Sequence, residues 1–175
     1  MDQFSVDQLF NQVDFFLGDS IMRRTVTNMG MDHSFKSGNK ICVDLCVGGQ
    51  TVLNLKRRLR FSESDNSMWH FKAQNATLVL MIGTNDILKG TNMKSFKKAL
   101  QWMIKDLMKM GVRRLLMCTI PPLYKYDVSS INSNIELCSK MPNVHLVDIY
   151  NAFIENKENL LERFVHKNSF NIFSF

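Results

Sequence analysis

The chain has 175 residues, 45% of them hydrophobic, which is enough apolar material for one sizeable core. No apolar run approaches the roughly 18 residues of a membrane-spanning helix, and the acidic start Met-Asp-Gln-Phe-Ser-Val-Asp is unlike a secretory signal peptide. The net charge of +6 suits an anionic partner. We therefore expect a single domain over residues 1–175 and a cytoplasmic location.

The first half of the chain predicts two strands, a helix and a loop. Residues 14–18 are a short apolar run that ends in glycine, and residues 41–47 are a second run followed by two glycines, so we expect a strand in each. Residues 51–60 have the apolar spacing of a helix whose basic residues face largely outward. The Ser-, Asp- and Asn-rich stretch 61–74 is expected to be a long surface loop.

The second half alternates strands and helices. Residues 77–82 form an uninterrupted apolar run, as in a parallel strand buried on both faces. Helical spacing over 95–110 and a strand pattern over 114–120 follow, and then a helix over 130–140 and a strand over 144–148. This alternation implies right-handed crossovers, and therefore a three-layer α/β/α sandwich with a mainly parallel sheet.

The cysteines have no Cys-x-x-Cys spacing and lie mostly in apolar, strand-like stretches. Buried thiols are therefore expected, and neither disulfides nor zinc ligands. Nothing in the sequence predicts a cofactor or a metal site. The four residues are Cys42, Cys46, Cys118 and Cys138.

Three of the predicted strands end in polar, glycine-containing segments. These are Leu17-Gly18-Asp19-Ser20, Val47-Gly48-Gly49-Gln50-Thr51 and Ile82-Gly83-Thr84-Asn85-Asp86. In an open parallel sheet, ligands bind beyond the carboxyl ends of the strands. The three segments are therefore the candidate site, although their glycines could merely permit tight turns while Asp19 and Asn85 tie loops together.

In order and separation, these segments resemble the Gly-Asp-Ser, glycine and Gly-x-Asn-Asp blocks of the SGNH/GDSL hydrolases, and the resemblance spans nearly the whole chain. It implies the flavodoxin-like SGNH fold and places Ser20 in the nucleophile position. The amides of Ser20 and Gly49 and the side chain of Asn85 would then stabilise an oxyanion. His166 occupies the position of the general base.

The fourth family block, Asp-x-x-His, is incomplete. Arg163 stands where the family usually has aspartate, three residues before His166, and the adjacent Glu162 is one position out of phase. Arginine cannot accept the imidazole N–H, and its charge opposes an imidazolium. Losing the orienting carboxylate of a serine triad costs about 10⁴ in turnover. The sequence therefore favours a degenerate hydrolase that has been turned to binding.

A basic SGNH-like domain with a defective triad is similar to the OSK domains of insect germ plasm, which are described as non-enzymatic RNA-binding modules. Residues 89–125 carry nine lysines and arginines against the single acid Asp106, a balance that also suits a merely solvated face. The residues expected to bind single-stranded RNA or mRNA untranslated regions are Arg23, Arg24, Lys56, Arg57, Arg58 and Arg60, with Arg113 and Arg114 as a second patch.

Further candidates and alternatives remain open at this point. Trp69, His70 and Phe71 could stack on bases, although aromatic side chains more often pack. The alternative function is an esterase that uses Ser20 and His166, and a third possibility is a scaffold whose cleft binds a protein. The RNA hypothesis predicts that replacing Arg57 and Arg58 together weakens binding.

Overall fold

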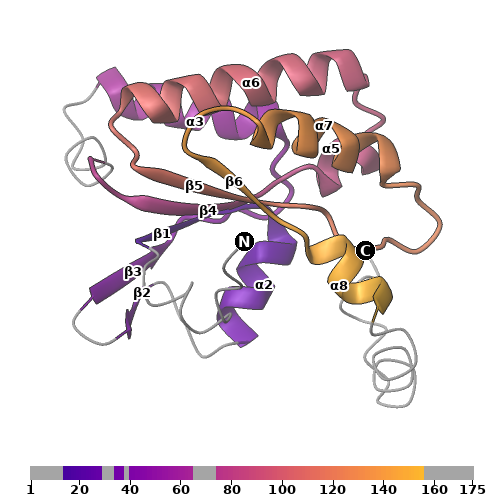
Figure 1. The fold of residues 1–175 in the computed structure, drawn as a ribbon, viewed down its shortest axis with the longest axis horizontal. Coiled ribbons are helices and arrows are strands. Elements are labelled where there is room, and N and C mark those ends of the chain that lie inside the picture. Colours follow the sequence, from indigo (N-terminus) through magenta and orange to yellow (C-terminus); the bar gives the residue numbers. More distant parts are fainter. Residues whose placement is uncertain (1–13, 29–33, 38–39, 65–73, 156–175) are drawn as a thin grey trace.

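A six-stranded sheet runs through the middle of the molecule in the computed structural model, which describes residues 14–28, 34–37, 40–64 and 74–155 (Figure 1). The strand order is β2-β3-β1-β4-β5-β6, and all neighbours are parallel except the antiparallel pair β2-β3. The strands are β1 (Phe15–Gly18), β2 (Ser34–Ser37), β3 (Lys40–Asp44), β4 (Thr77–Met81), β5 (Arg114–Cys118) and β6 (Val144–Val147).

Helices cover both faces of this sheet. Figure 1 shows α2 and α8 on one face and α3, α6 and α7 on the other, with α5 following the end of β4. The helices are α2 (Ser20–Asn28), α3 (Val52–Ser64), α5 (Thr84–Leu88), α6 (Met93–Lys109), α7 (Ser129–Ser139) and α8 (Ile149–Glu155). The fold is therefore the predicted three-layer α/β/α sandwich.

The core lies between the sheet and the helices that cover it. Every residue of β4 is buried because helices flank this central strand on both sides. Helix α6 buries one apolar stripe against the sheet, including Phe96, Leu100 and Leu107. It begins at Asn92, whose side chain accepts hydrogen bonds from the amides of Lys94 and Ser95.

Close packing at the end of β1 explains the glycine that precedes the polar segment there. A Cβ atom at Gly18 would overlap the carbonyl oxygen of Met81 on the neighbouring strand β4. Only glycine lets the two strands approach this closely. This approach fixes the position at which Ser20 begins α2.

The strands and helices that the sequence predicted are all present, with ends that differ by a few residues. One boundary expectation is wrong, because α3 continues to Ser64 and so occupies the beginning of the predicted loop 61–74. Residues 65–73 lie outside the described part of the chain. The edge strand β2 and the helices α2, α5 and α8 were not predicted, because each is too short to show a clear apolar period.

All four cysteines are free and buried, as predicted. Burial raises the pKa of the Cys118 thiol to about 12, so this sulfur is held as an unreactive thiol. Among the described helices, none has the length and apolar character to cross a membrane. No group of three or more potential metal ligands was found among the same residues.

Candidate functional site

The three polar segments meet at the carboxyl edge of the sheet. Ser20 is the first residue of α2, directly after β1, and Gly48 lies in the turn between β3 and α3. Asn85 lies in α5, directly after β4. These strands are parallel neighbours, so their carboxyl ends lie side by side.

Hydrogen bonds between these segments hold their relative positions. Asn85 Nδ2 donates to the carbonyl of Gln50 at 3.2 Å, and the Val52 amide donates to Asp86 Oδ2 at 2.9 Å. On the exposed side, Lys89 Nζ donates to the carbonyl of Gly49 at 3.0 Å. One of the two N–H groups of the Asn85 side chain is therefore bonded to the loop after β3. Asn85 thus ties two loops together, which is the structural role that the sequence also allowed.

Two buried carboxylates accept hydrogen bonds from backbone amides next to the site. Asp19 Oδ1 accepts a hydrogen bond from the amide of Ile21 at 2.9 Å, and Asp86 caps the start of α3 through Val52. Burial raises the pKa of the Asp19 carboxyl, and burial together with the charge of Asp19 raises the pKa of Asp86. Both side chains serve the fold at this edge, because neither is exposed to solvent.

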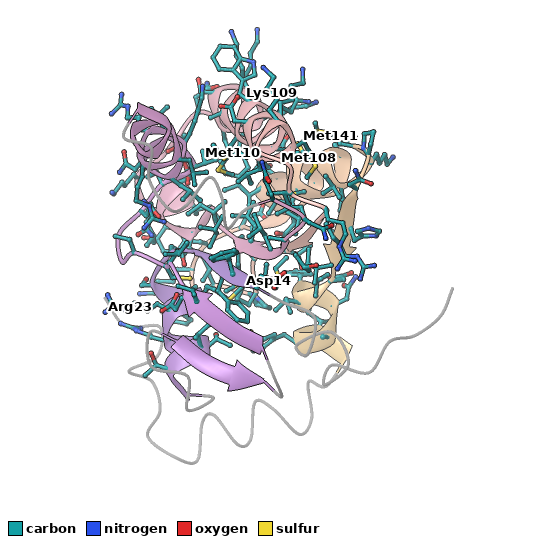
Figure 2. The ribbon with its side chains drawn as sticks, turned by 90° about the vertical axis from the view of Figure 1, so that its left-hand side faces the viewer. Asp14, Arg23, Met108, Lys109, Met110 and Met141 are labelled. Atoms are coloured by element: carbon teal, nitrogen blue, oxygen red, sulfur yellow. The ribbon has the colours of Figure 1, made fainter. Side chains whose placement is uncertain are left out.

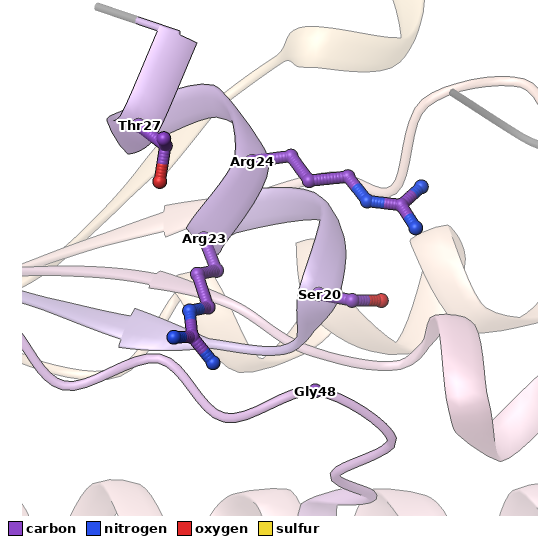
Figure 3. Close-up of a pocket in the computed structure, with 5 residues that line it drawn as sticks. All are labelled: Ser20, Arg23, Arg24, Thr27 and Gly48. Carbon is purple, nitrogen blue, oxygen red and sulfur yellow. The ribbon is translucent and has the colours of Figure 1, made fainter. Parts of the chain in front are cut away.

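A pocket of about 320 Å³ opens beside Ser20. Four of its lining residues come from one face of α2, at the i, i+3, i+4 and i+7 spacing. Figure 3 shows the Arg24 side chain and the Ser20 hydroxyl projecting toward the same side, while Arg23 turns toward the backbone at Gly48. The lining residues are Ser20, Arg23, Arg24, Thr27 and Gly48.

The serine hydroxyl in this pocket lies among cationic groups. Ser20 Oγ is buried and makes no hydrogen bond to another side chain or backbone group in the described residues. Within the described part of the chain, the ionisable groups that line the pocket are the guanidinium groups of Arg23 and Arg24, which are permanent cations without acceptor atoms. The pocket can therefore attract an anion, and the lining residues that the structure describes include no group that could take a proton from Ser20.

Other predicted members of the catalytic set are placed differently or lie outside the described residues. Gly48 lines the pocket, whereas Gly49 is not among the described lining residues; it has φ +71°, and a Cβ atom there would meet no other atom within 4 Å. His166 and Arg163 lie outside the described part of the chain. Of the four histidines, the structure describes His145, which is exposed on β6.

The basic run of α3 does not form one outward surface. The expectation that its basic residues face outward is wrong for Lys56, which is only 7% exposed and holds its ammonium 3.9 Å from the ring centre of Trp102. Arg58 is partly buried, and its Nη2 donates to the carbonyl of Leu45. Arg57 is exposed. The side chain of Arg60 is outside the described part of the structure.

The second predicted basic patch lies away from the pocket. Arg113 and Arg114 precede and begin β5, at the amino edge of the sheet, whereas Ser20 lies at the carboxyl edge. Arg113 Nη2 lies 3.4 Å from Thr77 Oγ1, to which it donates a hydrogen bond. The stacking candidates Trp69, His70 and Phe71 are in a stretch that the structure does not describe.

Sequence reasoning missed two residues at or beside the pocket. Lys89 reaches the glycine loop beside the pocket, and Thr27 completes its wall. The Thr27 position could have been found from the helical spacing that begins at Ser20. No comparable signal marks Lys89, because its contact with Gly49 joins residues 40 positions apart in the chain.

A family model described as the OSK domain matches residues 3–169. The chain belongs to the OSK domain family. No curated protein sequence is similar enough to count as a match. The family assignment therefore rests on the match to the OSK family model, which covers nearly all of the sequence.

Solved structures show the same fold as this OSK domain. The OSK domain of Drosophila Oskar is 17% identical, with 87% of this chain and 76% of that chain covered and a TM-score of 0.61. A lipolytic protein of the G-D-S-L family from Veillonella parvula is also 17% identical, covering 82% of this chain and 81% of its own at a TM-score of 0.62.

An enzyme of the same fold is also similar. The psychrotrophic esterase EstA from Pseudoalteromonas sp. is 16% identical, with 86% of this chain and 84% of that chain covered and a TM-score of 0.57. The OSK domain thus has an SGNH-like α/β fold, as its three polar blocks predicted. At these identities, the likeness shows the fold, while the chemistry depends on the residues in the pocket.

Proposed function

We propose that this OSK domain binds RNA through cationic side chains at the carboxyl edge of its sheet and does not act as a hydrolase. The observation that carries the proposal is the pair Arg23 and Arg24 in the wall of the Ser20 pocket. Guanidinium groups present several donors in a planar fork that matches a phosphate group. Acyl transfer would instead need a base beside the serine, and none of the described lining residues provides one.

The pocket has the groups that would hold one backbone phosphate. Arg23 and Arg24 provide charge from two sides of Ser20, and the serine hydroxyl provides a further donor. Lys89, held at the neighbouring Gly49 carbonyl, adds a fourth cationic or donor group to the rim. Phosphate contacts of this kind give affinity and position without reading the base sequence.

The resemblance to the OSK domains supports a wider role for the proposed RNA binding. The OSK domain of Drosophila Oskar shares this fold. RNA binding in germ plasm is what the resemblance in the sequence implies. We infer a cytoplasmic role in germ-plasm mRNA regulation, with single-stranded segments such as untranslated regions as the target. Arginine suits such targets because its guanidinium plane can also stack on unpaired bases.

The test is binding of a labelled single-stranded RNA to the domain over a salt series. We expect Arg23→Gln and Arg24→Gln each to weaken binding by about tenfold, which is the effect of losing one charge-assisted hydrogen bond. Arg57→Gln tests the exposed arginine of α3 separately. Arg58 is a poor choice for this test, because its guanidinium holds the Leu45 carbonyl and its loss would disturb the fold.

A matched control removes the same charge elsewhere. Lys125→Gln with Lys140→Gln lowers the net charge by two at exposed positions distant in sequence from α2, as Arg23→Gln combined with Arg24→Gln does on α2. Equal weakening by this control and by the arginine pair would contradict a defined phosphate site. Absence of RNA binding at low salt, with ester hydrolysis that is lost in Ser20→Ala and His166→Ala, would establish the esterase alternative instead.

A further inference from the structure

Helix α6 carries a lysine stripe with a tryptophan at its centre. Lys94, Lys98, Trp102, Lys105 and Lys109 follow one another at intervals of three or four residues, and all five are exposed. At 3.6 residues per turn, these positions fall within about 80° of one another around the helix, so they form a single line about 22 Å long. The opposite face of α6 is buried in the core.

Trp102 is unusual among these residues because lysines contact its ring while much of it stays open to solvent. Its exposed fraction is 45%. Lys56 of α3 lies 3.9 Å from the ring centre and is itself buried, whereas the exposed Lys98 lies 4.9 Å from it. The buried lysine fixes the indole from the α3 side, and the exposed one is free to swing away.

We propose that this stripe is a second RNA-binding surface, on which one base of a single strand stacks on Trp102 while lysines on either side contact the flanking phosphates. The proposal rests on the proposed RNA-binding function. Stacking of a base on an indole is sequence-tolerant, because every base has a π-face. The base would take the place of Lys98 over the ring, and Lys98 would move to a phosphate.

The composition of the stripe favours a nucleic acid over a protein as its ligand. The members other than Trp102 are lysines, and lysine is depleted in protein–protein interfaces. The one acid of α6, Asp106, is partly buried and does not belong to the exposed line. A row of cations around a single exposed aromatic ring is the pattern expected of a surface that follows a phosphate backbone.

The stripe is physically separate from the Ser20 pocket. Helices α2 and α6 cover opposite faces of the sheet (Figure 1). In the view with side chains, Lys109 lies at the top of the molecule and Arg23 lies well below it, beside the strands (Figure 2). Substitutions on α6 therefore leave the pocket intact, and the two contributions to RNA binding can be measured independently.

Tryptophan fluorescence tests the inference directly. The chain has two tryptophans, so Trp69→Phe leaves Trp102 as the single indole. We expect its emission to be quenched as oligouridylate of about 12 nucleotides is added. The quenching should saturate with the same dissociation constant that a labelled copy of this RNA gives. A stacked base quenches an indole, whereas binding elsewhere on the molecule would leave the emission unchanged.

Substitutions supply a second readout. Trp102→Ala should weaken binding by about tenfold, as expected for the loss of one stacked base, and Trp102→Phe by less because the ring is retained. Because Trp102→Ala also removes the contact with Lys56, Lys98→Gln with Lys105→Gln provides a variant that changes only exposed side chains. Lys125→Gln with Lys140→Gln is again the charge-matched control.

The outcomes separate this inference from the proposed function. One outcome is that labelled RNA binds and that the Arg23 and Arg24 variants weaken this binding, while Trp102 is not quenched and the α6 variants have no effect. This outcome would overturn the stripe and leave the pocket in place. Quenching and loss of affinity confined to the α6 variants would support the stripe and overturn the pocket. No RNA binding by the intact domain would overturn both.

Discussion

The arginines of α2 and the basic residues 56–58 of α3 both follow the end of a strand, but their side chains have different surroundings. On α2, Arg23 and Arg24 both reach the pocket that contains Ser20. On α3, three successive residues diverge: Lys56 is buried against Trp102, Arg57 is exposed, and Arg58 donates to a backbone carbonyl. A cluster of charge in the sequence is thus not a cluster on the surface.

The difference comes from helical phase. Successive residues of an α-helix point about 100° apart, so a run of three covers more than half the circumference. Helix α3 lies against the sheet and against α6, and one or two members of any such run must therefore face protein. The α2 arginines share a pocket because Ser20, three and four residues earlier, lies on the same face as they do.

Arg58→Ala should have the largest effect on stability among the arginine substitutions. It leaves the Leu45 carbonyl without its donor in a partly buried site, which costs about 1–3 kcal/mol. Arg57→Ala, one position earlier and exposed, should change the free energy of unfolding by less than about 0.5 kcal/mol. Urea denaturation of the two variants measures the contrast. Equal losses would show that the two arginines are equivalent in the fold.

The contact between Lys56 and Trp102 should appear as a coupling between α3 and α6. A double-mutant cycle with Lys56→Met and Trp102→Leu should give a coupling free energy of about 1 kcal/mol, as expected for a partly desolvated cation over an indole. The same cycle with Lys98 in place of Lys56 should give a smaller coupling free energy, because Lys98 is exposed. A coupling near zero in both cycles would mean that the contact contributes only packing.

The α2 arginines should matter for RNA binding and little for folding. Replacing Arg23 and Arg24 together with glutamine should lower the slope of log affinity against log salt by about 0.7, because the two arginines contact one phosphate of a single strand. Thermal unfolding of the same variant should stay close to that of the parent. A loss of affinity with an unchanged salt slope would argue against phosphate contacts at these positions.

The buried carboxylates of Asp19, just before α2, and Asp86, in α5, should make stability depend on pH. The folded-state pKa values of Asp19 and Asp86 are raised, so the folded state favours their protonated forms. Their contribution to stability should therefore grow as the pH falls through the raised values toward the ordinary Asp pKa of about 3.9, and be lost as the pH rises.

Asp86→Asn tests this dependence, because the amide oxygen can still accept from Val52. The variant should show a flatter change of unfolding free energy than the parent protein as the pH rises above the ordinary Asp pKa of about 3.9. A variant with the same pH dependence as the parent would assign the effect to other groups.

The sequence by itself determined the layered α/β fold and the positions of the three polar blocks. Strand runs such as 77–82 are apolar on both faces, and glycines such as Gly18 are required where strands approach each other. Both signals are local, and the fold and family that they predicted are confirmed.

Only the tertiary structure decided which basic side chains are available to a ligand. Lys56 and Arg58 are adjacent to Arg57 in the sequence, but their contacts with Trp102 and Leu45 depend on how α3 packs against α6 and the loop after β3. The tryptophan at the centre of the α6 stripe is likewise exposed only because its buried neighbours face the sheet. Long-range packing sets the orientation of a helix, and local sequence cannot specify it.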